Sequence, residues 1–203
     1  SGLPTVISTG MGTLSEIDLA VRTYRKAGGD KLVLLHCVSA YPTPPEDVNL
    51  RKIETLQKAF GCPVGFSDHT DGIVAAVEAV AFQACFVEKH FTTDKNLPGP
   101  DHRFSSDPEE FQRLVEAVRA AEKMLGTSVI APASSEMEGR RQFQLSCVIK
   151  RELPAGHRIE DGDVDIRRPG SGLHPGAMDW IVGSVLTRDV SEGEPVTREL
   201  FTD

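Results

Sequence analysis

Two histidines at the ends of successive apolar runs are the residues in this sequence best suited to chemistry. His69 lies near the end of the segment Val64–Thr70, and His90 lies near the end of the segment Phe86–Phe91. Each run predicts a buried strand, and in an α/β barrel the carboxyl ends of the strands carry the reacting groups. A single strand-end histidine is more often a hydrogen-bonded core or rim residue. Two on successive strands favour a divalent-metal site for Mn²⁺, Zn²⁺ or Fe²⁺, with open positions for water and substrate oxygens.

Two carboxylates accompany the histidines. Glu88 precedes His90 by two positions, so on a strand both side chains point to the same face. Such a carboxylate can orient a substrate hydroxyl or move a proton, or it can be the buried partner of a lysine. Asp101 follows the stiff segment Pro98–Pro100, which either holds it over the site or uses it to cap the turn.

Several neighbouring residues are expected to support this site. Asp68 and His102 suit a supporting role, and Lys89 should point outward towards the helices. His36 ends another apolar run, where its imidazole either orients a neighbour through a hydrogen bond or serves as a ligand. Of these two alternatives, the hydrogen-bonding role is favoured.

Hydroxyl groups at the strand ends could bind an anion. Ser8, with the amides of Thr9–Met11, and Ser67 suit a phosphate or a carboxylate. Tyr41 begins a proline-rich segment and is expected to form a lid or a wall of the site. Arg168 belongs to a rigid Arg-Arg-Pro-Gly loop, which is either a solvated surface pair or a guanidinium that reaches into an active site.

Alternating strand and helix patterns position these residues in the first two thirds of the chain. A capping-box sequence opens the first helix at Thr13, and Asp107-Pro108 opens the last. Four βα units in succession predict a parallel sheet, which is half of an eight-stranded barrel or a small open sheet. The strands are expected at 4–8, 31–36, 63–67 and 85–90, and the helices at 13–27, 53–60, 72–83 and 107–125.

The composition changes after Leu125. Residues 1–125 carry the βα units, residues 126–142 are rich in Ser, Pro, Ala and Glu and predict a linker, and residues 143–203 predict a small β-rich domain. In this last part, strand-like pieces occur at 145–149, 163–166 and 180–186. The segment 151–164 is echoed by 188–201, which predicts a pseudo-symmetric fold.

The bulk composition excludes several classes of protein. The 203 residues are 39% apolar, with a net charge of −8, which disfavours nucleic acid or an anionic membrane as a partner. No apolar run approaches the roughly 20 residues of a membrane span. The four cysteines show no CxxC spacing and are interpreted as reduced, buried thiols of a cytoplasmic protein.

At these motifs the chain resembles the sialic acid synthase family, whose members make N-acetylneuraminate and related nonulosonic acids. The resemblance implies the C-terminal half of a TIM barrel followed by a small β-rich antifreeze-like (SAF) domain. The matching segments cover nearly the whole chain: Ser8–Met11, Leu35–Pro44, Gly65–Thr70, Glu88–Thr92, Pro98–His102 and Arg168–Gly172.

The resemblance also implies a reaction, in which phosphoenolpyruvate condenses with the open-chain form of an N-acylated amino sugar such as N-acetylmannosamine, and phosphate is released. His69 and His90 match the family's ligands for a divalent metal, usually Mn²⁺, with Mg²⁺ or Co²⁺ as alternatives. The remaining matches concern the substrates. The family's sugar-binding carboxylates correspond to Glu88 and Asp101. The groups that bind phosphoenolpyruvate correspond to Ser8, Ser39 and Ser67. In the family an arginine reaches the N-acyl group from the partner of a domain-swapped homodimer, and it corresponds to Arg168.

The family's chains are longer, and this sequence begins at what corresponds to the fifth barrel strand. We therefore expect a fragment that is a weak enzyme or none when alone. Two alternatives remain at this point. One is a non-catalytic, self-associating assembly module, and the other is a different metal-dependent barrel enzyme of the aldolase type, against which the Arg168 loop argues.

Overall fold

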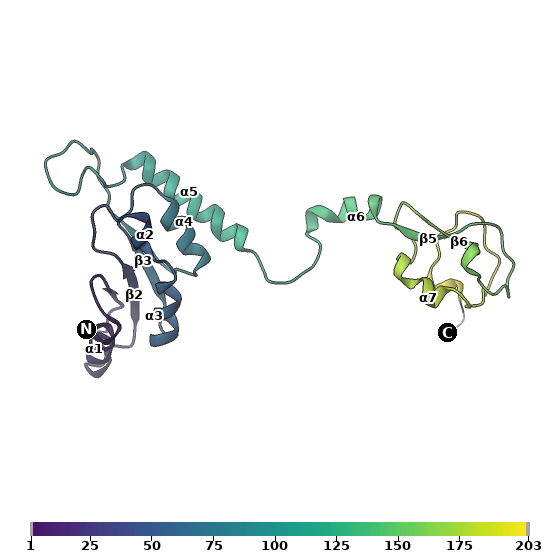
Figure 1. The fold of residues 1–203 in the computed structure, drawn as a ribbon, viewed down its shortest axis with the longest axis horizontal. Helices are drawn as coiled ribbons and strands as arrows, with labels where there is room; N and C mark the ends of the chain where they lie inside the picture. Colours follow the sequence, from purple (N-terminus) through teal and green to yellow (C-terminus); the bar gives the residue numbers. More distant parts are fainter. Residues whose placement is uncertain (1, 202–203) are drawn as a thin grey trace. The chain divides into compact units, whose positions relative to one another are not determined.

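The computed structural model describes residues 2–201, and the chain divides into two compact units between Thr127 and Ser128. The first unit contains a parallel sheet with its helices, and the second is a small β-rich unit with short helices (Figure 1).

Four parallel strands form the sheet of the first unit, in the order β1-β2-β3-β4, so that each strand neighbours the next one in the chain. The strands are β1 (Thr5–Ser8), β2 (Leu32–Cys37), β3 (Val64–Asp68) and β4 (Val87–Lys89). The helices are α1 (Leu14–Lys26), α2 (Pro45–Val48), α3 (Lys52–Phe60), α4 (Val74–Ala81) and α5 (Pro108–Leu125). The expectation of four βα units forming half a barrel is confirmed, whereas the short helix α2 was not predicted within the proline-rich loop.

Local sequence signals explain where the helices begin and end. The Thr13 hydroxyl accepts a hydrogen bond from the amide of Glu16 at the start of α1, and the Asp107 carboxylate accepts one from the amide of Glu110 at 2.8 Å at the start of α5. Both capping boxes therefore satisfy amides that a helix leaves unpaired. At the end of α3, Gly61 adopts a positive φ of 60°, a conformation that glycine tolerates best.

One face of the sheet packs against helices. Leu34, Val64 and Phe66 are buried there with Ile53 and Leu56 of α3. Because side chains alternate along a strand, the residues between them point to the opposite face. On that second face Val6 is 48% exposed, and Ser8 and Glu88 are also exposed.

The expectation that the fourth strand is buried is wrong. Val87 is partly exposed and Glu88 is exposed, because β4 lies at the edge of the sheet in the described residues, whereas the side chain of Lys89 is buried. The prediction that the cysteines are buried is wrong for two of them. Cys37 and Cys147 are buried, but Cys62 is half-buried and Cys85, just before the edge strand, is exposed.

The second unit contains an antiparallel pair, β5 (Ser146–Ile149) and β6 (Val164–Arg167), which confirms the small β-rich domain. The segment 134–143, expected within and just beyond the linker, carries a 3₁₀ turn and the helix α6 (Met137–Phe143). The strand expected over 180–186 is wrong in its first part. Trp180 belongs to α7 (Met178–Ile181), which follows the 3₁₀ turn that begins at Pro175, while Leu186 forms an isolated bridge with Phe201.

The predicted internal echo appears in the hydrogen bonds of the second unit. Its two halves are related by a shift of 37 positions, that between Arg151 and Arg188. Leu153 and Val190, which are equivalent by this shift, exchange both backbone hydrogen bonds with each other. Equivalent bonds then recur in pairs: Gly156 to Leu186 with Gly193 to Ile149, Lys150 to Asp163 with Thr187 to Leu200, and Ile159 to Ser184 with Val196 to Cys147.

No helix among the described residues is long and apolar enough to cross a membrane.

Candidate functional site

The structure brings His69 and His90 together at the carboxyl ends of β3 and β4. Their ring centroids lie 5.2 Å apart, with the planes at 68°. His69 is buried, whereas the side chain of His90 is 31% exposed. The pair arises because the two residues follow register partners on adjacent parallel strands, Asp68 and Lys89.

His69 is held in one orientation. Its Nδ1 lies 2.8 Å from the carbonyl oxygen of Val38, which can only accept, so Nδ1 carries the proton and donates it. The lone pair of Nε2 is then available to a metal, and such a bond to a carbonyl is the usual support of a ligating histidine. The backbone carbonyl of His69 accepts a hydrogen bond from the amide of Thr43 at 2.9 Å.

Tyr41 forms a wall of the site. Its ring centroid is 4.3 Å from that of His69 and 5.7 Å from that of His90. Phe104 closes the group, at 5.2 Å from His90 and 5.7 Å from Tyr41. Phe104 was not predicted, and its place two residues after His102 in the same loop was the only signal for it.

Asp101 lies beside His90 but does not bind it closely. Its Oδ2 is 3.8 Å from His90 Nδ1, which is beyond hydrogen-bond distance, and its side chain is 56% exposed. His102 turns away to Thr92, whose hydroxyl lies 2.8 Å from His102 Nδ1. The loop thus holds His102 in a supporting contact and leaves the Asp101 carboxylate open.

Glu88 and Ser67 lie next to each other on the face of the sheet opposite to α3, where Glu88 is exposed and Ser67 is buried. They are register partners, and the Ser67 hydroxyl donates to Glu88 Oε1 at 2.7 Å. The alternative that Glu88 is the buried partner of a lysine is wrong, because Lys89 pairs with Asp68 on the other face. Ser8, at the end of β1, is exposed on the same face as Ser67 and Glu88.

Of the two alternatives for His36, the structure supports the hydrogen-bonding role. Its Nε2 lies 2.6 Å from the carbonyl oxygen of Val48, and its ring stacks on Phe66 within the helix-covered face. Burial lowers the pKa of His36, and the nearby Lys52 charge acts in the same direction, although the bond to Val48 opposes both. His36 is therefore a neutral, structural residue beneath the site.

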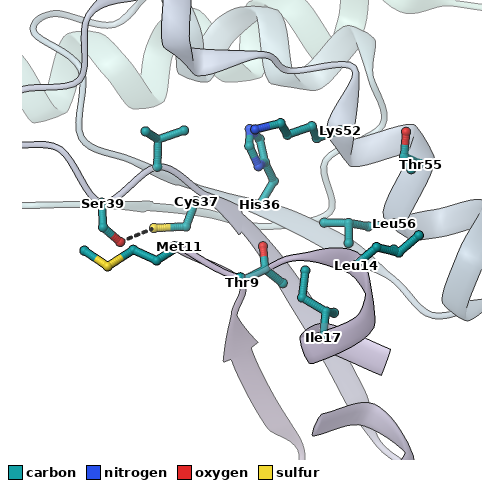
Figure 2. A pocket seen from close by; sticks show the side chains of 12 residues that line it. Thr9, Met11, Leu14, Ile17, His36, Cys37, Ser39, Lys52, Thr55 and Leu56 are labelled. Carbon is teal, nitrogen blue, oxygen red and sulfur yellow. Dashed lines mark hydrogen bonds between the residues drawn. The ribbon is translucent and has the colours of Figure 1, made fainter. Parts of the chain in front are cut away.

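A cavity of about 540 Å³ opens at the carboxyl ends of β1 and β2, between α1 and α3. Figure 2 shows Ser39 and Cys37 on one side of it and Lys52 beside His36 on another. The Ser39 hydroxyl lies 3.9 Å from Cys37 Sγ, which is also 3.9 Å from His69 Nδ1. Cys37, which lines this cavity with Ser39, thus lies between Ser39 and His69.

Arg168 lies in the second unit, on an exposed loop that two hydrogen bonds hold in place. The hydroxyl of Ser146 donates to the carbonyl of Pro169 at 2.9 Å, and the amide of Gly170 donates to the carbonyl of Arg141 at 3.2 Å. Arg168 is therefore exposed to solvent on a loop whose backbone is held by hydrogen bonds.

The histidine pair fits a metal ion that takes its other ligands from water and substrate. Among the described residues, no three His, Cys, Asp or Glu side chains converge as a complete metal cage. Two imidazoles, one with its Nε2 freed by the Val38 bond, fit a site with open positions rather than a closed structural one.

Comparison with known proteins identifies relatives for both units. Residues 1–130 match the NeuB family, and residues 146–202 match the SAF domain. The N,N'-diacetyllegionaminic acid synthase of Legionella pneumophila is 45% identical over 195 residues, which cover 94% of this chain and 55% of that protein. A pseudaminic acid synthase of Campylobacter jejuni is 36% identical over 198 residues, covering 98% and 57%.

A solved structure agrees with these sequence relatives. The N-acetylneuraminic acid (sialic acid) synthetase of Leptospira borgpetersenii superposes with a TM-score of 0.62 at 40% identity, over 68% of this chain and 48% of that one. The present chain thus spans little more than half the length of the curated relatives described above. From the match to its first 130 residues and the SAF match that follows, the chain belongs to the NeuB family.

Proposed function

We propose that this protein is a nonulosonic acid synthase that joins phosphoenolpyruvate to an N-acylated amino sugar. The observation that carries the proposal is the pairing of His69 and His90 under Tyr41, with the Ser67–Glu88 pair on the adjoining face. The names of the relatives support it, since they include synthases of legionaminic, pseudaminic and neuraminic acids.

The reaction balances without an external oxidant or reductant. Carbon 3 of phosphoenolpyruvate attacks the aldehyde carbon of the open-chain sugar, and the aldehyde oxygen gains a proton. Water adds at carbon 2 and its oxygen becomes the new keto oxygen, while the bond between carbon 2 and the phosphate oxygen breaks. One proton of the water is taken up at the former aldehyde oxygen and the other by the leaving phosphate. The hydroxyls of Ser8 and Ser39 would donate to the anionic groups of phosphoenolpyruvate, and Ser67 would do so on giving up its present bond to Glu88. The carboxylates of Glu88 and Asp101 would accept from sugar hydroxyls.

His69 and His90 would hold the divalent metal, with Mn²⁺ as the first candidate and Mg²⁺ or Co²⁺ as alternatives. When bound, that metal would polarise the aldehyde oxygen of the sugar. The protein contributes the fixed His69 tautomer and the aromatic wall of Tyr41 and Phe104, which would shield one side of the histidine pair.

Arg168 would complete the site from a second copy of the chain. Its guanidinium is exposed on a braced loop, a geometry that suits donation to the acyl oxygen of the sugar. The proposal therefore includes a domain-swapped homodimer. Phosphoenolpyruvate is an intermediate of cytoplasmic metabolism, which makes the cytoplasm the proposed location.

Phosphate release from phosphoenolpyruvate tests the activity directly. The full-length protein should release phosphate only when Mn²⁺ and an amino sugar are both present, and mono-N-acetylated and di-N-acetylated sugars should be compared. Release that is independent of the sugar, or no release with any of them, would contradict the proposal. Self-association without release would instead favour an assembly module.

Subunit mixing tests the proposed role of Arg168. The Arg168→Ala change should raise the KM for the sugar and reduce kcat/KM by roughly 10- to 150-fold, the loss of one charge-assisted hydrogen bond. Mixed dimers of Arg168→Ala and His90→Ala subunits should regain activity, since one of their two sites is intact. Mixed dimers confirmed by mass that stay inactive would place Arg168 outside the partner's site.

A further inference from the structure

A buried ion pair lies directly beneath the histidine pair. Lys89 Nζ is 2.9 Å from Asp68 Oδ2, and their side chains are 3% and 0% exposed. The two are register partners on β3 and β4, and each immediately precedes one of the two histidines. They lie on the helix-covered face, opposite to Ser67 and Glu88.

The same two side chains bracket the tripeptide that contains His69. Asp68 Oδ1 accepts hydrogen bonds from both the amide and the hydroxyl of Thr70, each at 2.8 Å. Lys89 Nζ also donates to the carbonyl of Thr70 at 2.5 Å. One ammonium group from the strand of His90 therefore binds both ends of the segment 68–70, with His69 at its centre.

Backbone hydrogen bonds from other loops also hold the two histidines. The carbonyl of His69 accepts from the amide of Thr43, and the carbonyl of His90 accepts from the amide of Ser106 at 2.8 Å. Among the described residues, two side-chain contacts link β3 to β4: Ser67 with Glu88 on one face, and Lys89 with Asp68 on the other. Of these two, only the Lys89 ammonium also reaches Thr70, on the far side of His69. It therefore ties the segment of one histidine to the strand of the other.

A dry ion pair is a poor way to stabilise a fold, because removing both charges from water costs about as much as their attraction returns. Apolar residues of similar volume at these two positions would serve packing equally well. The hydrogen-bond geometry, in contrast, has no apolar substitute, since it fixes the turn that carries His69.

We propose that Asp68 and Lys89 are positioning residues that set the separation and orientation of His69 and His90. The inference rests on the proposed function only in taking the two histidines as metal ligands. Its consequence is that loss of the pair loosens metal binding while the protein remains folded, because partners beyond the ligands orient the ligands themselves.

The test uses the double variant Asp68→Asn/Lys89→Met in the full-length protein. Asparagine retains an oxygen that can accept from Thr70, so the turn keeps its local bonds, while the cross-strand ammonium and both buried charges are lost. The matched control is Glu54→Gln/Lys58→Met, which removes an exposed ion pair of 3.5 Å on α3. Mn²⁺ binding is measured by electron paramagnetic resonance, folding by thermal unfolding, and the His69 tautomer by imidazole ¹⁵N shifts in the metal-free protein.

We expect the double variant to unfold near the wild-type temperature but to bind Mn²⁺ about 10-fold more weakly, at the low end for partners of metal ligands. The ¹⁵N shifts of His69 should move from a single Nδ1–H form towards an average of both tautomers, and the control should match wild type. A folded double variant with Mn²⁺ affinity within about twofold of wild type would overturn the proposal.

Two further results separate the possible failures. If the double variant does not fold, the Mn²⁺ affinity of Thr70→Val tests the proposal instead. This change removes one hydrogen bond to Asp68 but keeps the ion pair. A roughly threefold loss of Mn²⁺ affinity would support the proposal, and an unchanged affinity would overturn it. If wild type binds Mn²⁺ no better than His69→Ala, the metal site itself is wrong, and the metal-free His69 shifts then decide whether Asp68 and Lys89 position the ring.

Discussion

Both units of this protein pair a histidine with an aspartate, yet the two pairs differ in nearly every physical respect. In the second unit, His157 Nε2 lies 2.7 Å from Asp163 Oδ2, and the Asp163 side chain is 2% exposed. In the first unit, His90 Nδ1 lies 3.8 Å from Asp101 Oδ2, and the Asp101 side chain is 56% exposed. One pair is closed and the other is open.

In the closed pair, both carboxylate oxygens of Asp163 are occupied by donors from the protein. Arg151 binds Asp163 Oδ1 through Nε at 3.0 Å and Nη2 at 2.6 Å, and the amide of Glu160 binds Oδ2. Burial opposes the charge on Asp163, but these donors together with His157 outweigh it and lower its pKa to about 2. A histidine beside a carboxylate therefore indicates a functional site only where the carboxylate oxygens are still accessible, as those of Asp101 are.

The largest expected effect comes from the open site. His90→Ala or His69→Ala should reduce kcat by roughly 10³-fold, about 4 kcal/mol in the barrier, because the proposed metal loses half of its protein ligands. The unfolding of the second unit should not change, as followed by the fluorescence of Trp180, the single tryptophan of the chain. Near-normal activity in both variants would show that the open histidine site has no role in the reaction.

The closed pair should show the opposite behaviour. Asp163→Ala should destabilise the second unit by about 2–4 kcal/mol, because a buried acceptor of four donors is lost, although the 61% exposed side chain of Arg151 can turn to water. Denaturant unfolding monitored at Trp180 measures this loss. Mn²⁺ binding at the first unit should stay as in wild type, and a matching fall there would show that the two units are coupled.

Acid should weaken the closed pair in a defined range of pH. Since the pKa of Asp163 is about 2 in the folded state and 3.8 in the reference state, its contribution to stability is complete above about pH 4 and is lost as the pH falls to about 2. The shift corresponds to about 2 kcal/mol. Unfolding curves of wild type and Asp163→Asn should differ at pH 6 and converge near pH 2, and a constant difference would contradict the assignment.

The smallest predicted effect distinguishes two serine hydroxyls. Ser67→Ala should reduce kcat/KM about fivefold, since one hydrogen bond to Glu88 of about 1 kcal/mol is lost beside the proposed substrate. Ser184→Ala removes a comparable bond to the carbonyl of Trp180 and should leave the kinetics unchanged. Equal kinetic effects in the two variants would show that Ser67 has no special role.

Sequence reasoning predicted the parts of this molecule that depend on local signals. The capping residues Thr13 and Asp107 and the alternation of strands and helices predicted the sheet, and the strand-end positions of His69 and His90 predicted their meeting. Contacts between distant loops left no such signal. The approach of Phe104 to His90 and the bond from His69 to Val38 depend on how separate loops fold back, which no spacing encodes.

Trp180 shows the converse failure. Its apolar surroundings suggested a strand, but the preceding proline and the following Gly183, at a φ of 91°, favour a short helical turn. The burial of β4 failed for a different reason, because an apolar run predicts a buried strand only when another element covers it.

The shift-related hydrogen bonds of the second unit bear on how fast it can fold. Most of its equivalent bonds join one half of the repeat to the other, as between Leu153 and Val190, so neither half completes its pairing alone. The bonds between the halves join residues 25 to 49 positions apart, whereas the paired strands of the first unit join residues 21 to 30 positions apart. Separation in sequence slows folding, so the Trp180 signal should report the slower of two kinetic phases.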